Sequence, residues 1–400
     1  MIYSQKSILK IIGREKNLFN TDVAEKQSEL LKEISKSSFL VLGAAGSIGQ
    51  AVTKEILKRN PKKLYAVDIS ENNLVELVRD IRSSIGYIDG DFKTFALDIG
   101  SLEYKKFIDS ERKFDYVINL SALKHVRSEE DVYTLMRMID VNIFNTEKTI
   151  KHAINNQSKK YFCVSTDKAA NPVNLMGASK RVMELFLMEM SNSINISTAR
   201  FANVAFSDGS LLHGFNERIK KEQPLVAPKD IKRYFLTYQE AGELCLMSII
   251  FGANNDIFFP KLEEKVNLIP LSEIAIRYIN MMGYEPYLCS SEEEARELAA
   301  FLPSKKQWPL FLSQTDTAGE KSFEEFYTLD EILDTDKFES IGIIKPSSKS
   351  NLDSINYFKS QISSIQNEEH WNKDKIIELF EIMIPNFKYI KNEKYLDGKM

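Results

Sequence analysis

A short apolar run at residues 39–42 ends in a turn with three glycines spaced three residues apart, and a helical pattern at 50–59 follows. Glycine at such positions lets the chain turn sharply and lets the backbone approach a pyrophosphate at the N-terminus of the next helix. Glycines at this spacing also occur in plain turns, so their place between a strand and a helix decides the interpretation. The unit predicts a dinucleotide-binding loop whose candidate contacts are Gly43, Gly46, Ser47, Ile48 and Gly49.

Five further apolar segments typical of strands follow, and helical patterns separate most of them. They cover residues 63–68, 94–97, 116–120, 161–165 and 196–201. Strands that alternate with helices at this spacing indicate a parallel sheet covered on both faces. We therefore expect an α/β fold of the Rossmann type, a doubly wound parallel sheet, with a smaller C-terminal substrate lobe and terminal helices.

The pattern divides the chain into four units, because the strand–helix rhythm weakens after about residue 206. They are an N-terminal helical extension at 1–37, an NAD-binding domain at 38–205, a substrate lobe at 206–345 and a helical tail at 346–400. The lobe is expected over the carboxyl ends of the strands, where open α/β sheets bind ligands. The extra terminal helices indicate self-association, so we expect a homo-oligomer.

Composition excludes several classes of protein. Lys plus Arg is 53 and Asp plus Glu is 57, so the formal net charge of −4 offers no footprint for nucleic acid. No apolar run reaches the roughly 18–20 residues of a membrane span, and no secretory signal pattern opens the chain. Cys163, Cys245 and Cys289 are too few and too scattered for a disulfide framework or a zinc site. We expect a cytoplasmic, metal-free protein without membrane insertion.

A carboxylate at the end of the second predicted strand indicates which dinucleotide binds. Asp68 can accept hydrogen bonds from both ribose hydroxyls of NAD and would repel the 2′-phosphate of NADP, so we expect NAD. The alternative is that Asp68 only caps the next turn. Asp98 and Ile99 follow the third strand and can clasp an adenine, although a loop role is common for such an aspartate. Ser121 and Ala122 follow the fourth strand, and their small side chains suit either a nearby cofactor or tight packing.

A polar segment ends the fifth predicted strand, and a helix that carries a lysine begins soon after it. The segment is Ser-Thr-Asp-Lys at 165–168, and the helix opens with Met-Gly-Ala-Ser-Lys at 176–180. Acid–base chemistry needs an acid and a base side by side, and Asp167 with Lys168 supplies both. A solvated pair at a strand end is the alternative, but the place of the pair in a nucleotide fold favours catalysis.

These segments occur together with others in a recognisable order. The others are Asn-Leu-Ser-Ala-Leu-Lys-His-Val at 119–126, Asn-Pro-Val-Asn-Leu at 171–175, Arg-Phe-Ala-Asn-Val at 200–204 and Arg-Tyr-Phe at 233–235. The set resembles the extended short-chain dehydrogenase/reductases, and within them the CapD-type nucleotide-sugar 4,6-dehydratases that act on UDP-N-acetylglucosamine. The resemblance covers about residues 38–270.

The resemblance implies a reaction cycle. Hydride leaves C4 of the sugar for the nicotinamide, water is eliminated across C5 and C6, and the hydride returns to C6 to give a 4-keto-6-deoxy sugar. It implies Asp167 as the acid at O6, Lys168 as the base at C5, Thr166 near O4 and Lys180 at the nicotinamide ribose. A lysine base needs a lowered pKa, which burial and a cationic neighbour can provide. The alternatives are a turn cap for Thr166 and a surface position for Lys180.

One position departs from the usual family pattern. The family's catalytic tyrosine lies four residues before the helix lysine, and this chain has Met176 there. A thioether cannot carry a proton, so a plain dehydrogenase that acts through a tyrosinate is excluded. The resemblance implies that some dehydratases of this group lack the tyrosine and retain the C5 configuration, with Met176 on the substrate side. The group that deprotonates O4 is left open.

Further positions are candidates for the substrate side. Lys124 can reach the sugar or a phosphate, whereas His125 is expected to be structural. Asn203 and Arg233 resemble positions that contact the diphosphate, and a surface salt bridge is the alternative for Arg233. Asn142 is expected to order backbone and water near the nicotinamide, or else to be a buried packing residue. Residues 316–320 are expected to be a loop over the sugar or toward a neighbouring subunit, or a simple structural loop.

The leading hypothesis is therefore an NAD-dependent nucleotide-sugar 4,6-dehydratase with a UDP-sugar as its partner. A nucleotide-sugar epimerase would use the same fold and hydride without eliminating water. A non-catalytic NAD-binding scaffold is a further alternative, because Met176 removes a familiar proton carrier.

Overall fold

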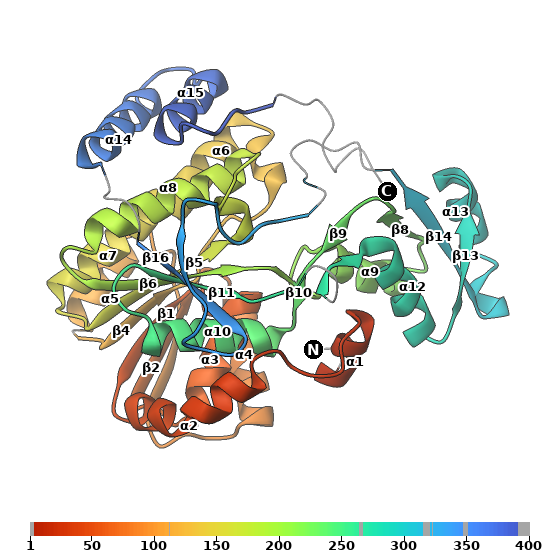
Figure 1. The fold of residues 1–400 in the computed structure, drawn as a ribbon, viewed down its shortest axis with the longest axis horizontal. Helices are drawn as coiled ribbons and strands as arrows, with labels where there is room; N and C mark the ends of the chain where they lie inside the picture. The colour runs from red at the N-terminus through yellow and green to blue at the C-terminus, as the bar shows by residue number, and fades with distance from the viewer. Residues whose placement is uncertain are drawn as a thin grey trace.

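The computed structural model describes residues 4–111, 113–263, 267–314, 321, 323–346 and 351–390. Within these residues the central feature is a nine-stranded sheet with the order β15-β16-β11-β6-β5-β4-β1-β2-β3 (Figure 1). The strands are β1 (Ser38–Leu42), β2 (Lys63–Asp68), β3 (Asp91–Ala96), β4 (Tyr116–Asn119), β5 (Lys160–Thr166), β6 (Asn195–Phe201), β11 (Asp256–Pro260), β15 (Ile332–Asp334) and β16 (Ile341–Lys345). Strands β1 to β6 and β11 are parallel, whereas β16 is antiparallel to β11 and to β15. The predicted parallel sheet is confirmed.

The strand order reverses between β1 and β4, because the chain runs outward from β1 to β3 and then crosses back to β4. Leu42, the last residue of β1, lies opposite Val67 of β2 and Asn119 of β4. The loops after β1 and β4 therefore leave the sheet together at its carboxyl edge. This reversal is the place where open α/β sheets bind ligands.

Helices cover both faces of the sheet, as the doubly wound pattern predicts (Figure 1). One face carries α3 (Ser47–Leu57), α4 (Glu71–Ser84) and α10 (Tyr238–Phe251). The other carries α5 (Leu102–Ser110), α6 (Val132–Ile139), α7 (Asn145–Asn155) and α8 (Leu175–Met190). A π-helical turn, Asp140–Phe144, joins α6 to α7. Alternate strand residues supply two separate cores: Phe39 and Val41 pack on the first face, and Leu40 and Leu42 on the second.

Two excursions of the chain from the sheet build a smaller lobe, on the right of Figure 1. The first contains β7 (Asn203–Val204), α9 (Leu211–Lys220), β8 (Leu225–Pro228), β9 (Lys232–Arg233) and β10 (Phe235–Leu236). The second contains β12 (Ile269–Pro270), α12 (Leu271–Met281), β13 (Glu285–Cys289), α13 (Glu292–Leu298) and β14 (Gln307–Ser313). Strands β8 and β13 both pair with β14, which joins the two excursions.

The boundaries of this lobe differ from the predicted unit at 206–345. Helix α10 and strands β11, β15 and β16 lie within that range but belong to the main body. The reason is their apolar side chains: Leu244, Phe258 and Ile343 are buried in the same core as Val41 of β1. The body therefore resumes twice after residue 206.

The terminal helices pack on this framework. Helix α1 (Gln5–Ile11) lies against α12 of the lobe, and α2 (Asn20–Ser35) lies against α10 of the body (Figure 1). Helices α14 (Leu352–Gln366) and α15 (Lys373–Met383) lie side by side and pack on α8. The apolar faces of all four helices are therefore buried inside the chain.

No helix in the described ranges has the length and apolarity needed to cross a bilayer. The same ranges hold no group of three or more His, Cys, Asp or Glu side chains arranged for a metal ion. Cys163, Cys245 and Cys289 are buried free thiols.

Candidate active site

A cavity of about 470 Å³ lies at the carboxyl edge of the sheet, beside the loops that follow β1, β4, β5 and β6. The cofactor and catalytic candidates come together in it, although they are far apart in the sequence. The predicted site residues that line it are Gly43, Gly46, Ser47, Ile48, Gly49, Ala122, Lys124, Thr166, Asp167, Lys168, Met176, Lys180 and Asn203. The predicted residues that do not line it are Asp68, Asp98, Ile99, Ser121, Asn142 and Arg233.

The glycine loop is tightly packed at two of its glycines and open at the third. Gly43 has a φ of +72°, and a Cβ there would lie 2.7 Å from the backbone nitrogen of Ser121. A Cβ at Gly49 would lie 2.0 Å from the carbonyl oxygen of Gly43. At Gly46 the nearest described atom to a Cβ is that same oxygen, at 3.7 Å. Because α3 has no side-chain cap, this open position at its N-terminus fits the pyrophosphate of a dinucleotide.

Asp68 supports the loop from the end of β2. Its Oδ2 accepts a hydrogen bond from the backbone nitrogen of Ala45 at 2.9 Å, and its Oδ1 accepts one from the backbone nitrogen of Ser70 at 2.9 Å. The turn-capping role is therefore present. Each carboxylate oxygen keeps a second lone pair, so the ribose contact stays a prediction.

The adenine-clasping role stays a prediction for Asp98 and Ile99. Asp98 accepts a hydrogen bond from the nitrogen of Gly100 at 2.8 Å and pairs with Arg137 at 3.1 Å, which engages both carboxylate oxygens outside the cavity. Ile99 is buried in the core on the α5 side of the sheet. The backbone of Ser121 lies close to Gly43, and its contact with the cofactor stays a prediction.

Helix α8 brings Met176 and Lys180 to the cavity. Lys180 is buried, and its Nζ donates to the carbonyl oxygen of Val164 at 3.2 Å, so the surface alternative is wrong. Burial lowers the pKa of Lys180, while Cys163 and Glu184 act in the opposite direction. Asn142 lies behind this helix on the π-helical turn and is fully buried, and its contacts do not reach the cavity.

The Asp167–Lys168 pair faces the cavity and has a third member. Lys168 Nζ lies 3.1 Å from Oδ1 of Asp167 and 3.4 Å from Oε1 of Glu324. Glu324 belongs to the segment that returns from the lobe to β15, and it also borders a second cavity of about 1480 Å³. Thr166 donates its hydroxyl to the same Oδ1 of Asp167 at 2.8 Å. Asp167 is 1% exposed, so the pair is not a solvated one at a strand end.

This arrangement corrects the expectation for Lys168. Burial lowers the pKa of Lys168, but the carboxylates of Asp167 and Glu324 outweigh it and raise the pKa above the ordinary value. The cationic neighbour that the sequence analysis required is Arg233, and its effect on the pKa is smaller. Lys168 is therefore held as an ammonium before substrate binds.

The substrate-side candidates divide between the cavity and the segment beside it. Burial lowers the pKa of Lys124, and Asp208 partly offsets this. Asn203 donates from its backbone nitrogen to Tyr234. Arg233 is 7% exposed and donates to the carbonyl oxygen of Lys321 at 2.9 Å, so the surface salt bridge is wrong. Residues 316–320 lie outside the described residues.

Sequence reasoning missed three residues near the cavity. His125 lines it, whereas only a structural role was expected. Asp208 also lines it, and its Oδ2 accepts a hydrogen bond from the hydroxyl of Ser47 at 2.9 Å. Glu324 reaches Lys168 from a distant segment. The Ser-Asp-Gly turn at 207–209 was a local signal for Asp208, but no local pattern marks Glu324.

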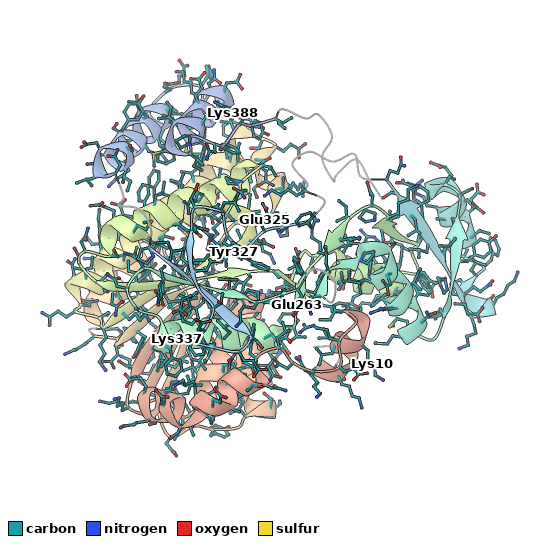
Figure 2. The ribbon with its side chains drawn as sticks, in the orientation of Figure 1. Lys10, Glu263, Glu325, Tyr327, Lys337 and Lys388 are labelled. Carbon is teal, nitrogen blue, oxygen red and sulfur yellow. The ribbon has the colours of Figure 1, made fainter. Side chains whose placement is uncertain are left out.

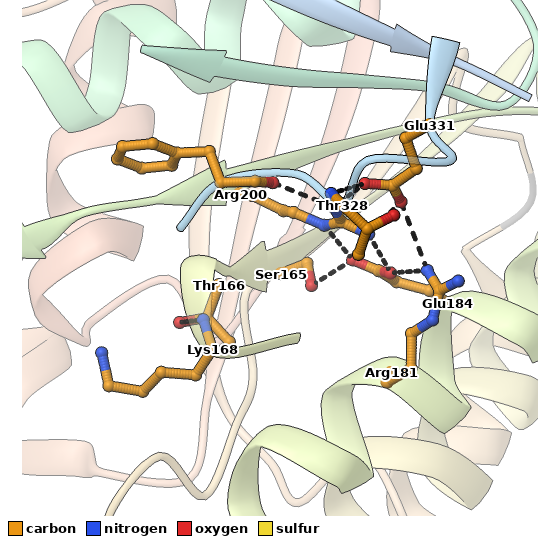
Figure 3. A network of polar contacts seen from close by, with 9 residues as sticks. Ser165, Thr166, Lys168, Arg181, Glu184, Arg200, Thr328 and Glu331 are labelled. Carbon is orange, nitrogen blue, oxygen red and sulfur yellow. Dashed lines mark hydrogen bonds and ion pairs between the residues drawn. The ribbon is translucent and has the colours of Figure 1, made fainter. Parts of the chain in front are cut away.

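A buried ion-pair network holds the returning segment next to the site (Figure 3). Arg200 on β6 is fully buried and binds Glu184 of α8 and Glu331 through paired bonds of 2.8 to 2.9 Å. It also donates to the carbonyl oxygen of Phe326 at 2.9 Å. Although burial acts to raise the pKa of Glu184, Arg200 lowers it to about 2. The buried guanidinium of Arg200 therefore fixes residues 326–331 to strand β6.

The fold is of the Rossmann type, and the comparisons place the chain among the nucleotide-sugar dehydratases and epimerases. Residues 39–346 match the family described as polysaccharide biosynthesis protein, and the chain belongs to this family.

Relatives of several kinds support this placement. An uncharacterized membrane protein of Methanocaldococcus jannaschii is 29% identical over 77% of this chain and 86% of its own length. The capsular polysaccharide biosynthesis protein CapD of Staphylococcus aureus is 27% identical over 78% of this chain, which spans about half of that relative (51%). A UDP-N-acetylglucosamine 4,6-dehydratase (inverting) of Campylobacter jejuni is 24% identical over 87% of this chain and 98% of its own length. UDP-glucose 4-epimerases are also among the relatives. The one from Rickettsia typhi is 29% identical over 65% of this chain and 79% of its own length.

Solved structures share the fold. Pen from Bacillus thuringiensis superimposes with a TM-score of 0.63 at 22% identity, over 88% of this chain and 98% of that chain. The dTDP-glucose 4,6-dehydratase DesIV from Streptomyces venezuelae was solved with NAD bound. It superimposes with a TM-score of 0.54 at 14% identity, over 73% of this chain and 88% of that chain.

Proposed function

We propose that the protein is an NAD-dependent nucleotide-sugar 4,6-dehydratase, a hydro-lyase. Its substrate is UDP-N-acetylglucosamine or a closely related NDP-hexosamine, and its product is the 4-keto-6-deoxy sugar. The observation that carries the proposal is that Asp167 and Lys168 line the same cavity as the glycine loop and Lys180. An acid–base pair beside a dinucleotide cradle is what elimination from an oxidised sugar requires.

The residues that would hold NAD are those of the loop and its supports. Gly46 and Ser47 would contact the pyrophosphate, Asp68 the adenosine ribose and Lys180 the nicotinamide ribose. When bound, the nicotinamide supplies reversible hydride acceptance, which links oxidation at C4 of the sugar to reduction at C6. NAD is preferred to NADP, because the carboxylate of Asp68 would repel a 2′-phosphate.

The pair can generate its own acid and base. The Lys168 ammonium passes one proton to Oδ1 of Asp167 across their 3.1 Å contact, which leaves an amine and a carboxylic acid. The amine takes the C5 proton of the 4-keto sugar, the C6–O6 bond breaks, and the acid protonates O6 as it leaves as water. Lys168 is then an ammonium and Asp167 a carboxylate again. As C6 is reduced, Lys168 gives a proton to C5, and the proton that O4 released during oxidation at C4 recharges the amine, so the pair is ready for another cycle.

In this proposal Thr166 would meet O4 of the sugar. Its hydroxyl already donates to Asp167, so it links the sugar oxygen to the pair. Met176 borders the same cavity and carries no proton, which suits a contact with the sugar and not a role in proton transfer.

The test is one incubation followed by mass spectrometry. Purified protein with NAD and a panel of UDP-, GDP- and dTDP-hexoses should convert UDP-N-acetylglucosamine to a product lighter by one water, and Asp167→Asn should abolish this. In deuterated water the product should carry deuterium at C5. Lys168→Ala should still bind NAD but should neither form this product nor exchange the C5 hydrogen of the substrate. Exchange at the native rate in Lys168→Ala would contradict the assignment of the base.

A nucleotide-sugar epimerase is the second candidate, because UDP-glucose 4-epimerases are among the relatives. It would give a product of unchanged mass in the same incubation. Bound NAD without turnover of any sugar would instead indicate a non-catalytic scaffold.

We also propose that the protein is a homo-oligomer in the cytoplasm. Light scattering tests the oligomeric state, and cell fractionation tests the location.

A further inference from the structure

The ammonium of Lys168 lies between two carboxylates that come from different parts of the chain. Asp167 precedes it in sequence, whereas Glu324 lies on the segment that returns from the lobe. Glu324 is 5% exposed, so its charge is enclosed. Among the described residues, neither Oδ2 of Asp167 nor Oε2 of Glu324 has a hydrogen-bond partner. Each carboxylate therefore holds Lys168 with one oxygen and keeps the other free.

The position of Glu324 does not depend on its contact with Lys168. The carbonyl oxygen of Phe326 accepts a hydrogen bond from Arg200, and Glu331 binds the same guanidinium. On the other side, the carbonyl oxygen of Lys321 accepts a bond from Arg233. Two buried arginines thus fix the chain before and after Glu324, and its carboxylate is carried to Lys168 by a segment that is already anchored.

The charges that face this cluster come from every element packed around it. Lys168 faces Asp167, Glu324 and Arg233, and Glu324 faces Lys168, Asp167, Arg233 and Lys321. Burial and the nearby charge of Asp167 raise the pKa of Glu324 above its ordinary value, although Lys168, Arg233 and Lys321 oppose this. The group therefore holds two carboxylates and one ammonium, surrounded by two further cations.

We propose that Glu324 is the positioning residue of Lys168: it is the counter-charge that stays with the lysine while Asp167 is protonated. The argument rests on the proposed function. Once Asp167 has taken the proton of Lys168, the amine has one carboxylate left beside it. When the amine then removes the C5 proton, Glu324 stabilises the new ammonium at the moment when Asp167 is still neutral. An opposite charge at this range favours the charged form by about one to three pKa units.

A consequence is that the proton-handling group is completed by the segment that returns from the lobe. The sequence neighbours of Lys168 supply one carboxylate, and the second arrives only with residues 323–331 in place. Substrate bound between lobe and body is thereby linked to the charge state of Lys168.

The test compares three variants that differ at two adjacent positions. Glu324→Gln keeps the shape and removes the charge, and Glu324→Asp keeps the charge on a shorter side chain. Glu325→Gln is the matched control, because Glu325 is exposed and contacts Asn171 and Lys321 instead of Lys168 (Figure 2). Thermal unfolding of each variant confirms that it is folded.

The first readout needs no turnover. Trace acetylation with acetic anhydride over a pH series, followed by peptide mass spectrometry, gives the pH at which Lys168 becomes reactive. We expect this pH to fall by about one to three units in Glu324→Gln, to return toward the native value in Glu324→Asp and to be unchanged in Glu325→Gln. An unchanged reactivity of Lys168 in folded Glu324→Gln would overturn the proposal.

The second readout is the pH profile of dehydration of UDP-N-acetylglucosamine. In Glu324→Gln we expect kcat to fall at least tenfold with KM little changed. In the pH profile of kcat, the limb that reflects the titration of Lys168 should move to lower pH. A fall in kcat without movement of that limb would contradict the positioning role. A shift in acetylation together with no dehydration by the native protein would refute the proposed function and leave the Glu324–Lys168 coupling intact.

Discussion

The side chain of Asn142 forms a two-way pair with the main chain of Leu123. Its Nδ2 donates to the carbonyl oxygen of Leu123 at 3.0 Å, and its Oδ1 accepts from the nitrogen of Leu123 at 3.0 Å. A third bond, from Nδ2 to the hydroxyl of Ser179 at 3.0 Å, joins the pair to α8. Asn142 thus fixes the loop that carries Lys124 to the helix that carries Lys180.

Asn142→Leu should destabilise the protein and disturb this loop. The substitution keeps the size of the side chain but leaves the buried polar groups of Leu123 without partners, which costs about 3 kcal/mol or more. Urea unfolding measures the loss, and Asn155→Leu, at an exposed position on α7, is the control. Equal stability of the two variants would show that the pair contributes little.

Two glycines of the loop should respond to alanine in opposite ways. Gly46→Ala places a methyl group in open space, so the fold should keep its Tm while NAD binding weakens at least about tenfold, or roughly 1.4 kcal/mol. Gly49→Ala drives a methyl group into the carbonyl of Gly43 and should lower stability by about 1–3 kcal/mol. Calorimetric titration with NAD and thermal unfolding separate the effects. Native NAD affinity in Gly46→Ala would refute the pyrophosphate cradle.

Asp208 places a carboxylate next to the proposed pyrophosphate site, because it binds the hydroxyl of Ser47 at the start of α3. Asp208→Asn should tighten NAD binding by about fivefold, or roughly 1 kcal/mol, and more at low ionic strength. Asp109→Asn, at an exposed position on α5, should leave affinity unchanged. Weaker NAD binding in Asp208→Asn would instead indicate that Asp208 orients Ser47 for the cofactor.

The enclosed guanidinium of Arg200 should make Glu331 important for stability. Glu331→Gln leaves part of that buried charge uncompensated, which costs about 3–5 kcal/mol. The exposed neighbour Asp330 provides the control Asp330→Asn, which should change stability by less than about 0.5 kcal/mol. Chemical denaturation measures both. The same loss in both variants would show that the network is not the cause.

Lys160 should make stability depend on pH. Burial lowers its pKa to about 7, although Asp256 acts in the opposite direction, and its Nζ donates to the carbonyls of Ser248 and Gly252. Because the unfolded chain holds this proton up to a pKa of about 10.4, stability should rise with pH between about 7 and 10. The contribution is at most about 1.4 kcal/mol per pH unit and is constant below pH 7.

The check for Lys160 is the pH dependence of unfolding in Lys160→Met. The slope should vanish in this variant and persist in Lys62→Met, where the lysine is exposed. A native slope in Lys160→Met would assign the effect to another group.

The parts of the fold that could be predicted from sequence are those with a local pattern. The strands at 38–42 and 160–166 are buried on both faces, so they appear as continuous apolar runs. Strand β3 begins at Asp91, earlier than the predicted residue 94, because this edge strand alternates exposed and half-buried residues. Strand β16 is also a buried apolar run, but its place in the sheet could not be predicted, because its pairing with β11 joins segments far apart in the chain.

The site shows the same division. The glycine loop and residues 166–168 could be placed at one edge of the sheet, since each lies beside a strand end with a recognisable spacing, and they line one cavity. The charge state of Lys168 could not be predicted in full, because Glu324 contributes to it together with Asp167. The place of Glu324 next to Lys168 depends on how Arg200 and Arg233 hold a distant segment.

The lobe is made of two separate stretches that leave the body and rejoin it, which limits how the lobe can be exchanged between proteins. If the proposed function holds, an altered sugar preference should not be acquired by exchanging a single terminal block, because β14 from one stretch pairs with β8 of the other stretch as well as with β13. Both stretches must be transplanted together, so chimaeras with a single crossover point inside 206–313 should misfold, while those that swap the pair should inherit the donor's preference.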